Sequence, residues 1–300
     1  MSQYFDSTKP MDYEGFIMAT ENLKNRYKFL QSFSCGKSVL GRNLTTFVIG
    51  NGIPGVLYVG AHHSLEYITA MILFEFIEQI CECMESGELL FGFDVKAILR
   101  SQSICILPML NPDGVELYLK GIKSAGLQKN NVKKQANNDY SDWQANAHGV
   151  DLNHNYNAGW DILHRLEINN GIKGPSPRRY GGVHAESEPE THALCNLCRR
   201  VPFCRAYALH SQGEEIYYFY GSRTPKNSLQ IAEKLAAASG YKICEPELLA
   251  SHGGFKDWFI NVFGRPAFTI EVGFGENPLP LSDYTHIYNK VAEMLLIGMI

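Results

Sequence analysis

A histidine and a glutamate stand three residues apart at the end of an apolar segment. His63 and Glu66 follow the segment 55–60, which is short, apolar and bounded by glycines, and which therefore predicts a strand. From Tyr67 onward, apolar residues recur at helical spacing. The pair thus falls at a strand-to-helix turn, where two side chains at this spacing converge. A catalytic zinc takes three ligands from histidine and carboxylate side chains, so the pair predicts part of a zinc site.

His210 and Glu271 occupy comparable positions later in the chain. His210 ends the predicted strand 206–209, which makes it the candidate third ligand. The segment 267–272 is an apolar strand interrupted by Glu271. An ionised carboxylate in such a segment is costly unless it is paired or functional. We therefore expect Glu271 to point from the strand end into the cleft and to serve as the base for a metal-activated water.

The elements that must position these residues alternate between strands and helices. Periodicity and composition mark further elements at 12–29, 44–49, 67–83, 103–110, 187–201, 216–220, 229–239, 255–262 and 283–296. The turn 50–54 predicts that strands 44–49 and 55–60 form a hairpin. The polar segment 120–147 predicts a long surface excursion. This order predicts one α/β domain over residues 1–300, with a lead-in helix within 1–42 and a catalytic core at 43–300.

Composition and charge exclude several classes of partner. The chain of 300 residues has 27 Lys and Arg against 31 Asp and Glu, so its net charge of −4 provides no basic surface for nucleic acid. No apolar stretch is long enough to predict a membrane span, and the first residues lack the pattern of a signal peptide. We therefore expect a cytoplasmic protein with no membrane partner. Its eight cysteines, including Cys195 and Cys198, are expected to be reduced core residues.

Five motifs in one order give the chain a resemblance to the zinc carboxypeptidase family from Tyr13 to Leu281. They are H-x-x-E at 63–66, N-P-D-G at 111–114, G-V-D-L-N at 149–153, the pair His210 and Ser211, and T-I-E at 269–271. The resemblance implies one Zn²⁺ per chain, held by His63, Glu66 and His210. It also implies that Glu271 acts first as general base and then as general acid. The fold it implies is a twisted, mixed sheet of eight strands with helices on both faces.

The chain departs from this family at positions that contact substrate. The family has an arginine after Asn153 that binds a terminal carboxylate, and here His154 stands in its place, which cannot form the same bidentate fork. Gln144 stands where a second family arginine polarises the scissile carbonyl. The family position at the base of the specificity pocket corresponds to Lys256, which favours a carboxylate on the substrate. The resemblance thus implies that Gln144, Asn153, His154 and Lys256 bind substrate.

Two further features of the family leave questions open. Its tyrosine near the active site would fall at Leu248 or Leu249 and is absent. The missing positive charge at position 144 has three candidate replacements, Arg178, Arg179 and Arg223, among which the sequence does not choose.

The segments 174–177, 187–191, 253–259 and 276–280 are similar to a bacterial branch of the family. That branch cleaves γ-D-glutamyl bonds to meso-diaminopimelate in peptidoglycan peptides, which implies a small muropeptide as substrate. One alternative is a metallocarboxypeptidase that releases C-terminal L-residues, although the lost arginine after Asn153 counts against it. Another is an inactive homologue that binds zinc or peptide, although an intact Glu271 counts against it. The oligomeric state stays open.

Overall fold

Eight strands form one mixed sheet in the computed structural model, which describes residues 2–245 and 252–300. The strands are β1 (Gln31–Lys37), β2 (Asn43–Gly50), β3 (Ile53–Val59), β4 (Gln102–Leu107), β5 (Arg205–His210), β6 (Glu215–Tyr217), β7 (Lys242–Ile243) and β8 (Ala267–Glu271). Their order across the sheet is β1-β2-β4-β3-β5-β8-β6-β7. The predicted eight-stranded mixed sheet is confirmed.

The centre of the sheet is parallel. Strands β4, β3, β5 and β8 run in one direction, whereas β1 and β2 lie antiparallel at one end and β6 lies antiparallel to β8 at the other. Because parallel strands end at the same edge, the residues that follow β3, β5 and β8 lie near one another. This edge therefore positions the site.

The predicted hairpin between 44–49 and 55–60 is wrong. Strand β4 lies between β2 and β3, antiparallel to the first and parallel to the second. The hairpin that does form joins β1 to β2, with Gln31 opposite Val48. Strand β1 has mostly exposed or half-buried side chains, so it carries no hydrophobic pattern that would have predicted it.

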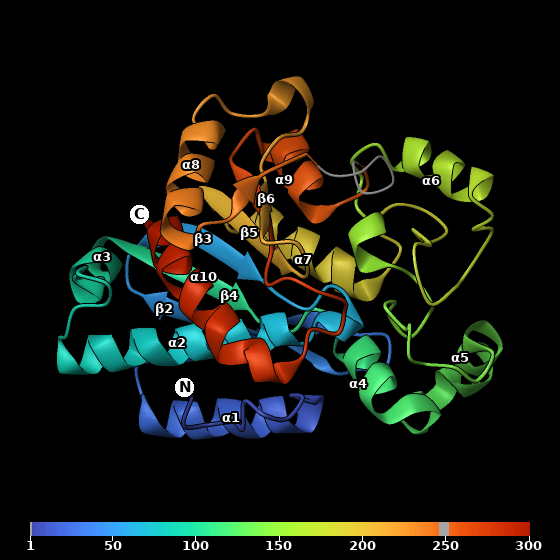
Figure 1. The fold of residues 1–300 in the computed structure, drawn as a ribbon, viewed down its shortest axis with the longest axis horizontal. Coiled ribbons are helices and arrows are strands. Elements are labelled where there is room, and N and C mark those ends of the chain that lie inside the picture. The colour runs from blue at the N-terminus through green and yellow to red at the C-terminus, as the bar shows by residue number, and fades with distance from the viewer. Residues whose placement is uncertain (1, 246–251) are drawn as a thin grey trace.

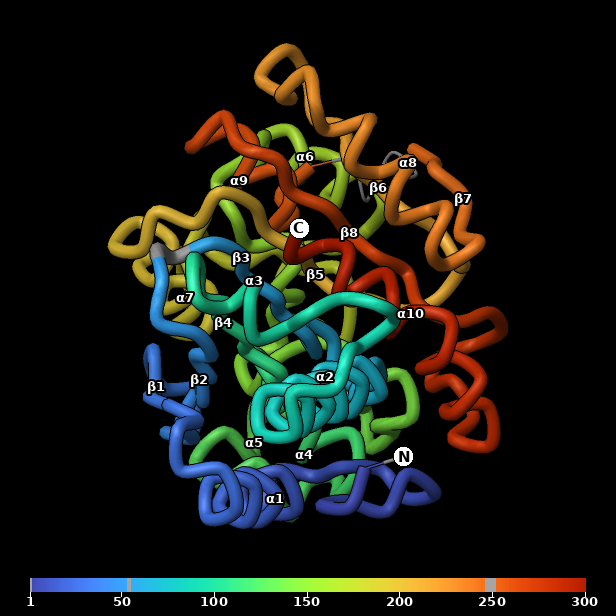
Figure 2. The backbone as a smooth tube through the Cα atoms, turned by 90° about the vertical axis from the view of Figure 1, so that its left-hand side faces the viewer, coloured from blue at the N-terminus to red at the C-terminus, as the bar shows by residue number. Residues whose placement is uncertain are grey.

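Helices cover both faces of the sheet. They are α1 (Tyr13–Arg26), α2 (Ile68–Ser86), α3 (Val95–Ser101), α4 (Pro112–Lys120), α5 (Lys129–Ala136), α6 (Trp160–Asn169), α7 (Pro189–Arg200), α8 (Ser228–Ser239), α9 (Phe255–Phe263) and α10 (Tyr284–Met299). One core cluster joins α1, α2, α8 and α10 to the sheet, and a second joins α7 and α9 to its other face (Figure 1). Figure 2 shows α7 and α9 on one side of the strands and α8 and α10 on the other.

Four helices, α3, α4, α5 and α6, were not predicted by periodicity, and α5 and α6 show why. The segment 120–147, expected to be an irregular excursion, contains α5, which buries only Val132 and Ala136. Helix α6 likewise buries only Leu163 and Glu167. With so few buried positions, neither helix has the apolar stripe on which the prediction depends.

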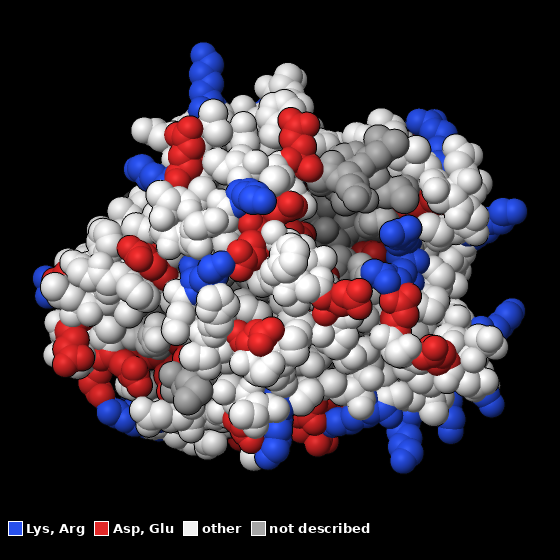
Figure 3. Space-filling view, in the orientation of Figure 1, with Lys and Arg blue, Asp and Glu red and all other residues white. Residues whose placement is uncertain are grey.

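Two other expectations concern the surface and the cysteines. No described helix is both long and apolar enough to cross a membrane. All eight cysteines are free thiols, and most are buried or half-buried. On the face shown in Figure 3, basic and acidic side chains are intermixed.

Candidate metal centre and active site

The turn after β3 is held by its own hydrogen bonds. Gly60 directly follows β3 and lies so close to the loop after β4 that a Cβ there would lie 2.7 Å from the carbonyl oxygen of Pro108. Ala61 then adopts a positive φ of 48°, which is strained for a residue with a side chain. The hydroxyl of Thr69 accepts a hydrogen bond from the Ala61 amide at 2.8 Å and donates to the Glu66 carbonyl at 2.7 Å. Thr69 thus closes the turn that carries His63 and Glu66.

Three buried side chains converge on one point at the edge of the sheet. The Nδ1 atom of His63 lies 2.8 Å from one carboxylate oxygen of Glu66, and Nδ1 of His210 lies 3.0 Å from the other. The two Nδ1 atoms are 3.3 Å apart. One candidate ligand atom from each residue lies within 4.8 Å of the others. Two imidazoles and a carboxylate at this spacing fit a zinc ion, with a fourth position left for water or substrate.

Asp151 orients the first of these ligands. Its Oδ1 atom lies 3.0 Å from Nε2 of His63, and a carboxylate can only accept, so Nε2 carries the proton. The lone pair of Nδ1 is then free to face the metal. The sequence analysis included Asp151 only as part of the 149–153 motif and predicted no role for it. The signal that could have identified it is an aspartate between the apolar residues of that motif, because a buried carboxylate needs a partner.

Glu271 lies beside the metal centre. Strand register pairs it with His210 across β5 and β8, and it lines the same cavity as Glu66. Desolvation in this half-buried position, together with the negative charge of Glu66, raises the pKa of Glu271 well above its usual value. A carboxylate with a raised pKa is a stronger base toward water, which is the property that a general base requires.

The metal centre opens into a cavity of about 910 Å³. Its polar lining includes Glu66, Asp142, Gln144, Arg178, Ser211, Gln212, Glu215, Tyr217, Glu245, Glu271, Glu276 and Asn277. Of the four predicted substrate residues, Gln144 lies on this wall. The lining as described does not include Asn153, His154 or Lys256.

Those three residues instead make contacts within the protein. The side chain of Asn153 accepts a hydrogen bond from the Phe255 amide at 3.0 Å. The imidazole of His154 is buried and lies 2.9 Å from a carboxylate oxygen of Glu167. These contacts join the loop 151–155 to α9 and α6. A direct role in substrate binding stays a prediction for both residues.

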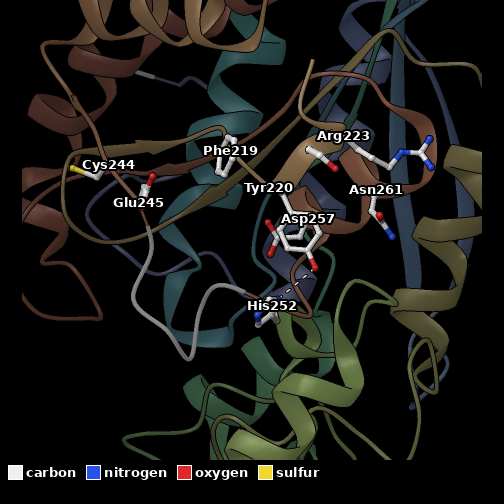
Figure 4. Close-up of a pocket in the computed structure, with 10 residues that line it drawn as sticks. Phe219, Tyr220, Arg223, Cys244, Glu245, His252, Asp257 and Asn261 are labelled. Atoms are coloured by element: carbon white, nitrogen blue, oxygen red, sulfur yellow. Dashed lines mark hydrogen bonds between the residues drawn. The ribbon is translucent and has the colours of Figure 1, made fainter. Parts of the chain in front are cut away.

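Lys256 is buried at the start of α9. Its ammonium group donates to the Phe219 carbonyl at 2.8 Å and forms an ion pair with Asp257. Asp257 also lines a separate cavity of about 450 Å³, together with Tyr220 and His252, as Figure 4 shows. Lys256 thus compensates a buried carboxylate, and its proposed role in specificity stays a prediction. Leu248 and Leu249 lie outside the described residues.

Comparisons with known proteins agree with this geometry. Residues 17–294 match the zinc carboxypeptidase family. The chain belongs to this family. It is 34% identical over 291 residues to gamma-D-glutamyl-L-diamino acid endopeptidase 1 of Lysinibacillus sphaericus, covering 96% of this chain and 72% of the relative. It is 32% identical over 273 residues to the uncharacterized protein YqgT of Bacillus subtilis strain 168, covering 90% and 72%.

The fold of this zinc carboxypeptidase family member also matches solved structures. The crystal structure of thrombin activatable fibrinolysis inhibitor superposes with a TM-score of 0.78 at 18% identity, covering 99% of this chain and 75% of that one. The family binds one zinc, and His63, Glu66 and His210 are its ligands here. When bound, zinc supplies Lewis acidity toward the scissile carbonyl and toward water. Asp151 holds His63 in the tautomer that binds the metal.

Proposed function

We propose that the protein is a zinc peptidase that hydrolyses the amide bond between γ-D-glutamate and meso-diaminopimelate in small cell-wall peptides. The observation that carries the proposal is the similarity over 96% of the chain to a relative named for γ-D-glutamyl-L-diamino acid cleavage. The site is compatible with that substrate, because Glu215, Glu245 and Glu276 line the cavity and carboxylates suit the free ammonium group of a diamino acid.

Glu271 is the proposed proton carrier. Its raised pKa suits it to take a proton from the attacking water and to return it to the nitrogen of the leaving diaminopimelate. The proton thus moves from the nucleophile to the leaving group through one carboxylate. Glu271 and His210, which would be a zinc ligand, lie opposite each other at the ends of β8 and β5, which are paired in register.

A metallocarboxypeptidase acting on ordinary C-terminal L-residues is the second candidate. The fork that such an enzyme needs for a terminal carboxylate is absent at position 154, where a buried histidine contacts Glu167 instead. A binder without activity is the third, and it has no need of a base at Glu271. We also expect the protein to act in the cytoplasm, which fractionation of the source cells tests.

The experiment compares two substrates. Zinc-loaded protein is incubated separately with L-Ala-γ-D-Glu-meso-diaminopimelate and with an ordinary L-tripeptide, and the products are identified by mass spectrometry. Release of diaminopimelate from the first peptide, abolished by chelation and restored by zinc, supports the proposal. Trimming of the ordinary peptide alone supports the carboxypeptidase, and no cleavage of either supports the binder.

A further inference from the structure

We infer that Arg178 binds the free α-carboxylate of the γ-linked D-glutamyl residue, on the acyl side of the scissile bond. This inference rests on the proposed function and adds a specificity-determining residue to it. Arg178 lies outside the five sequence motifs, in the loop before Tyr180, and its side chain reaches the cavity that contains Glu66 and Glu271.

Arg178 is held in place at the cavity wall by two contacts. Its Nε atom donates to the side-chain oxygen of Gln144 at 3.0 Å, and its Nη1 atom lies 2.5 Å from a carboxylate oxygen of Asp142. The remaining nitrogen, Nη2, has no hydrogen-bond partner among the residues that the structure describes. The side chain is 44% exposed, and it lines the cavity that contains Glu66 and Glu271.

The charge of the cavity makes this position selective. Among the described residues that line it, six are Asp or Glu and Arg178 is the one Lys or Arg. A substrate carboxylate that enters meets the negative charges of Glu215, Glu245 and Glu276 and attraction at Arg178. Because a guanidinium pairs with a carboxylate through two parallel hydrogen bonds, it fixes the orientation of the anion as well as its position.

Gln144 connects this guanidinium to the metal centre. Its oxygen accepts from Arg178, and its nitrogen donates to Oδ2 of Asp151 at 3.1 Å. The other oxygen of Asp151 accepts from His63. Arg178 and a zinc ligand are therefore joined by a continuous chain of hydrogen bonds through Gln144 and Asp151. An anion bound at Arg178 is thus held at a defined place relative to the metal.

The chemistry of the proposed substrate supplies the matching anion. In a γ-linked glutamyl residue, the α-carboxylate is free, and three carbon atoms separate it from the scissile carbonyl carbon. A peptide with a neutral residue at this place has no such group. The two other candidate arginines are placed differently, because Arg223 lines the separate cavity of Figure 4 and Arg179 does not line the metal cavity.

The ion pair with Asp142 does not prevent Arg178 from binding a substrate carboxylate. The side chain of Asp142 is 63% exposed, and an ion pair at such exposure is weak because solvent screens it. The substrate carboxylate approaches the unpaired edge of the guanidinium or displaces Asp142 from it. Either arrangement retains the hydrogen bond between Arg178 and Gln144.

The test deletes the carboxylate charge from the substrate and the positive charge from the enzyme. Zinc-loaded wild type, Arg178→Gln and the matched control Arg179→Gln are assayed on L-Ala-γ-D-Glu-meso-diaminopimelate and on the analogue in which D-isoglutamine replaces D-glutamate. We expect wild type and Arg179→Gln to prefer the carboxylate substrate by about 10- to 100-fold in kcat/KM. In Arg178→Gln the ratio should approach 1, because only the carboxylate substrate loses rate.

Each other outcome has a distinct meaning. If Arg178→Gln slows both substrates equally, or if the wild type does not distinguish them, Arg178 does not read the carboxylate and the inference is wrong while the proposed function stands. If the wild type cleaves neither substrate but retains zinc, the proposed function itself is wrong. Circular dichroism and zinc content of Arg178→Gln, expected to match the wild type, separate a binding defect from a folding defect.

Discussion

The Nε2 atom of His63 lies 3.0 Å from Oδ1 of Asp151, on the opposite side of the imidazole ring from Glu66 and His210. This contact ties a metal ligand to a buried carboxylate that also accepts a hydrogen bond from Gln144. Both the tautomer and the direction of the ring are therefore set before metal arrives.

Replacing Asp151 by asparagine should weaken zinc binding. The amide carries no charge, and it cannot accept from both His63 and Gln144 without reorganising. We expect the zinc dissociation constant to rise by about 10- to 100-fold, measured by competition with a chelator. Asp142→Asn, which removes an exposed carboxylate from the rim of the same cavity, is the control and should leave zinc affinity unchanged. Equal affinities for wild type and Asp151→Asn would show that the carboxylate does not orient the ligand.

Replacing Glu271 by glutamine should slow turnover strongly while leaving the metal in place. Glutamine keeps the shape of the side chain but cannot carry the proton from water to the leaving amine. We expect kcat to fall by about 10²- to 10⁴-fold on any substrate that the wild type cleaves. Zinc content, measured by atomic absorption, should stay at one ion per chain. A variant that retains full kcat would require a different base.

The Thr69 hydroxyl links stability to the metal site. Thr69→Val keeps the shape of the residue but removes the hydrogen bonds to the Ala61 amide and the Glu66 carbonyl. The free energy of unfolding should fall by about 1–3 kcal/mol in urea titrations, because two buried backbone groups lose their partner. Thr69→Ser retains the hydroxyl and should lose less. If valine and serine cost the same, packing rather than hydrogen bonding is the contribution of Thr69.

A buried carboxylate away from the metal makes stability depend on pH. Desolvation, with the negative charge of Asp113 nearby, raises the pKa of Glu190 from 4.5 to about 8. Between these values the folded state holds a proton that the unfolded state has released, so the free energy of unfolding decreases as pH rises toward 8. Glu190→Gln mimics the protonated form and should remove this decrease.

The two proteins are compared by urea denaturation from pH 5 to pH 9. Wild type and Glu190→Gln should have similar stability near pH 5. At pH 9 the variant should be more stable by up to about 4 kcal/mol. Parallel curves over the whole range would show that the Glu190 carboxyl titrates normally in the folded protein.

Local patterns predicted the ligand positions but not every neighbour in the sheet. His63, His210 and Glu271 were placed correctly at or just after strand ends. A buried strand is recognisable in the sequence as an apolar run, and the end of the run marks the end of the strand. The hairpin between 44–49 and 55–60 failed because strand order depends on long-range pairing, and β4 enters the sheet between those strands from more than 40 residues later in the chain. A turn signal is local and cannot report such an insertion.

Side-chain direction was the second limit. The family resemblance implied that Lys256 binds substrate, and that role stays a prediction. The sequence did not show that α9 directs the Lys256 ammonium group toward Phe219 and Asp257. Arg178 shows the converse, because it belongs to no motif and reaches the cavity only through the path of its loop. A charged side chain is long enough that its endpoint depends on the partners that the fold places around it, which spacing alone does not show.

The position of the cleaved bond decides whether the proposed peptidase activity is correct. Zinc-loaded protein hydrolyses L-Ala-γ-D-Glu-meso-diaminopimelate in ¹⁸O-labelled water, and tandem mass spectrometry locates the label in the products. We predict one ¹⁸O atom in the γ-carboxylate of the released L-Ala-D-Glu, together with unlabelled diaminopimelate, and far slower incorporation with Glu271→Gln. Label in free alanine would place the cut at the other peptide bond, and no incorporation by an enzyme that retains zinc would contradict the proposed activity altogether.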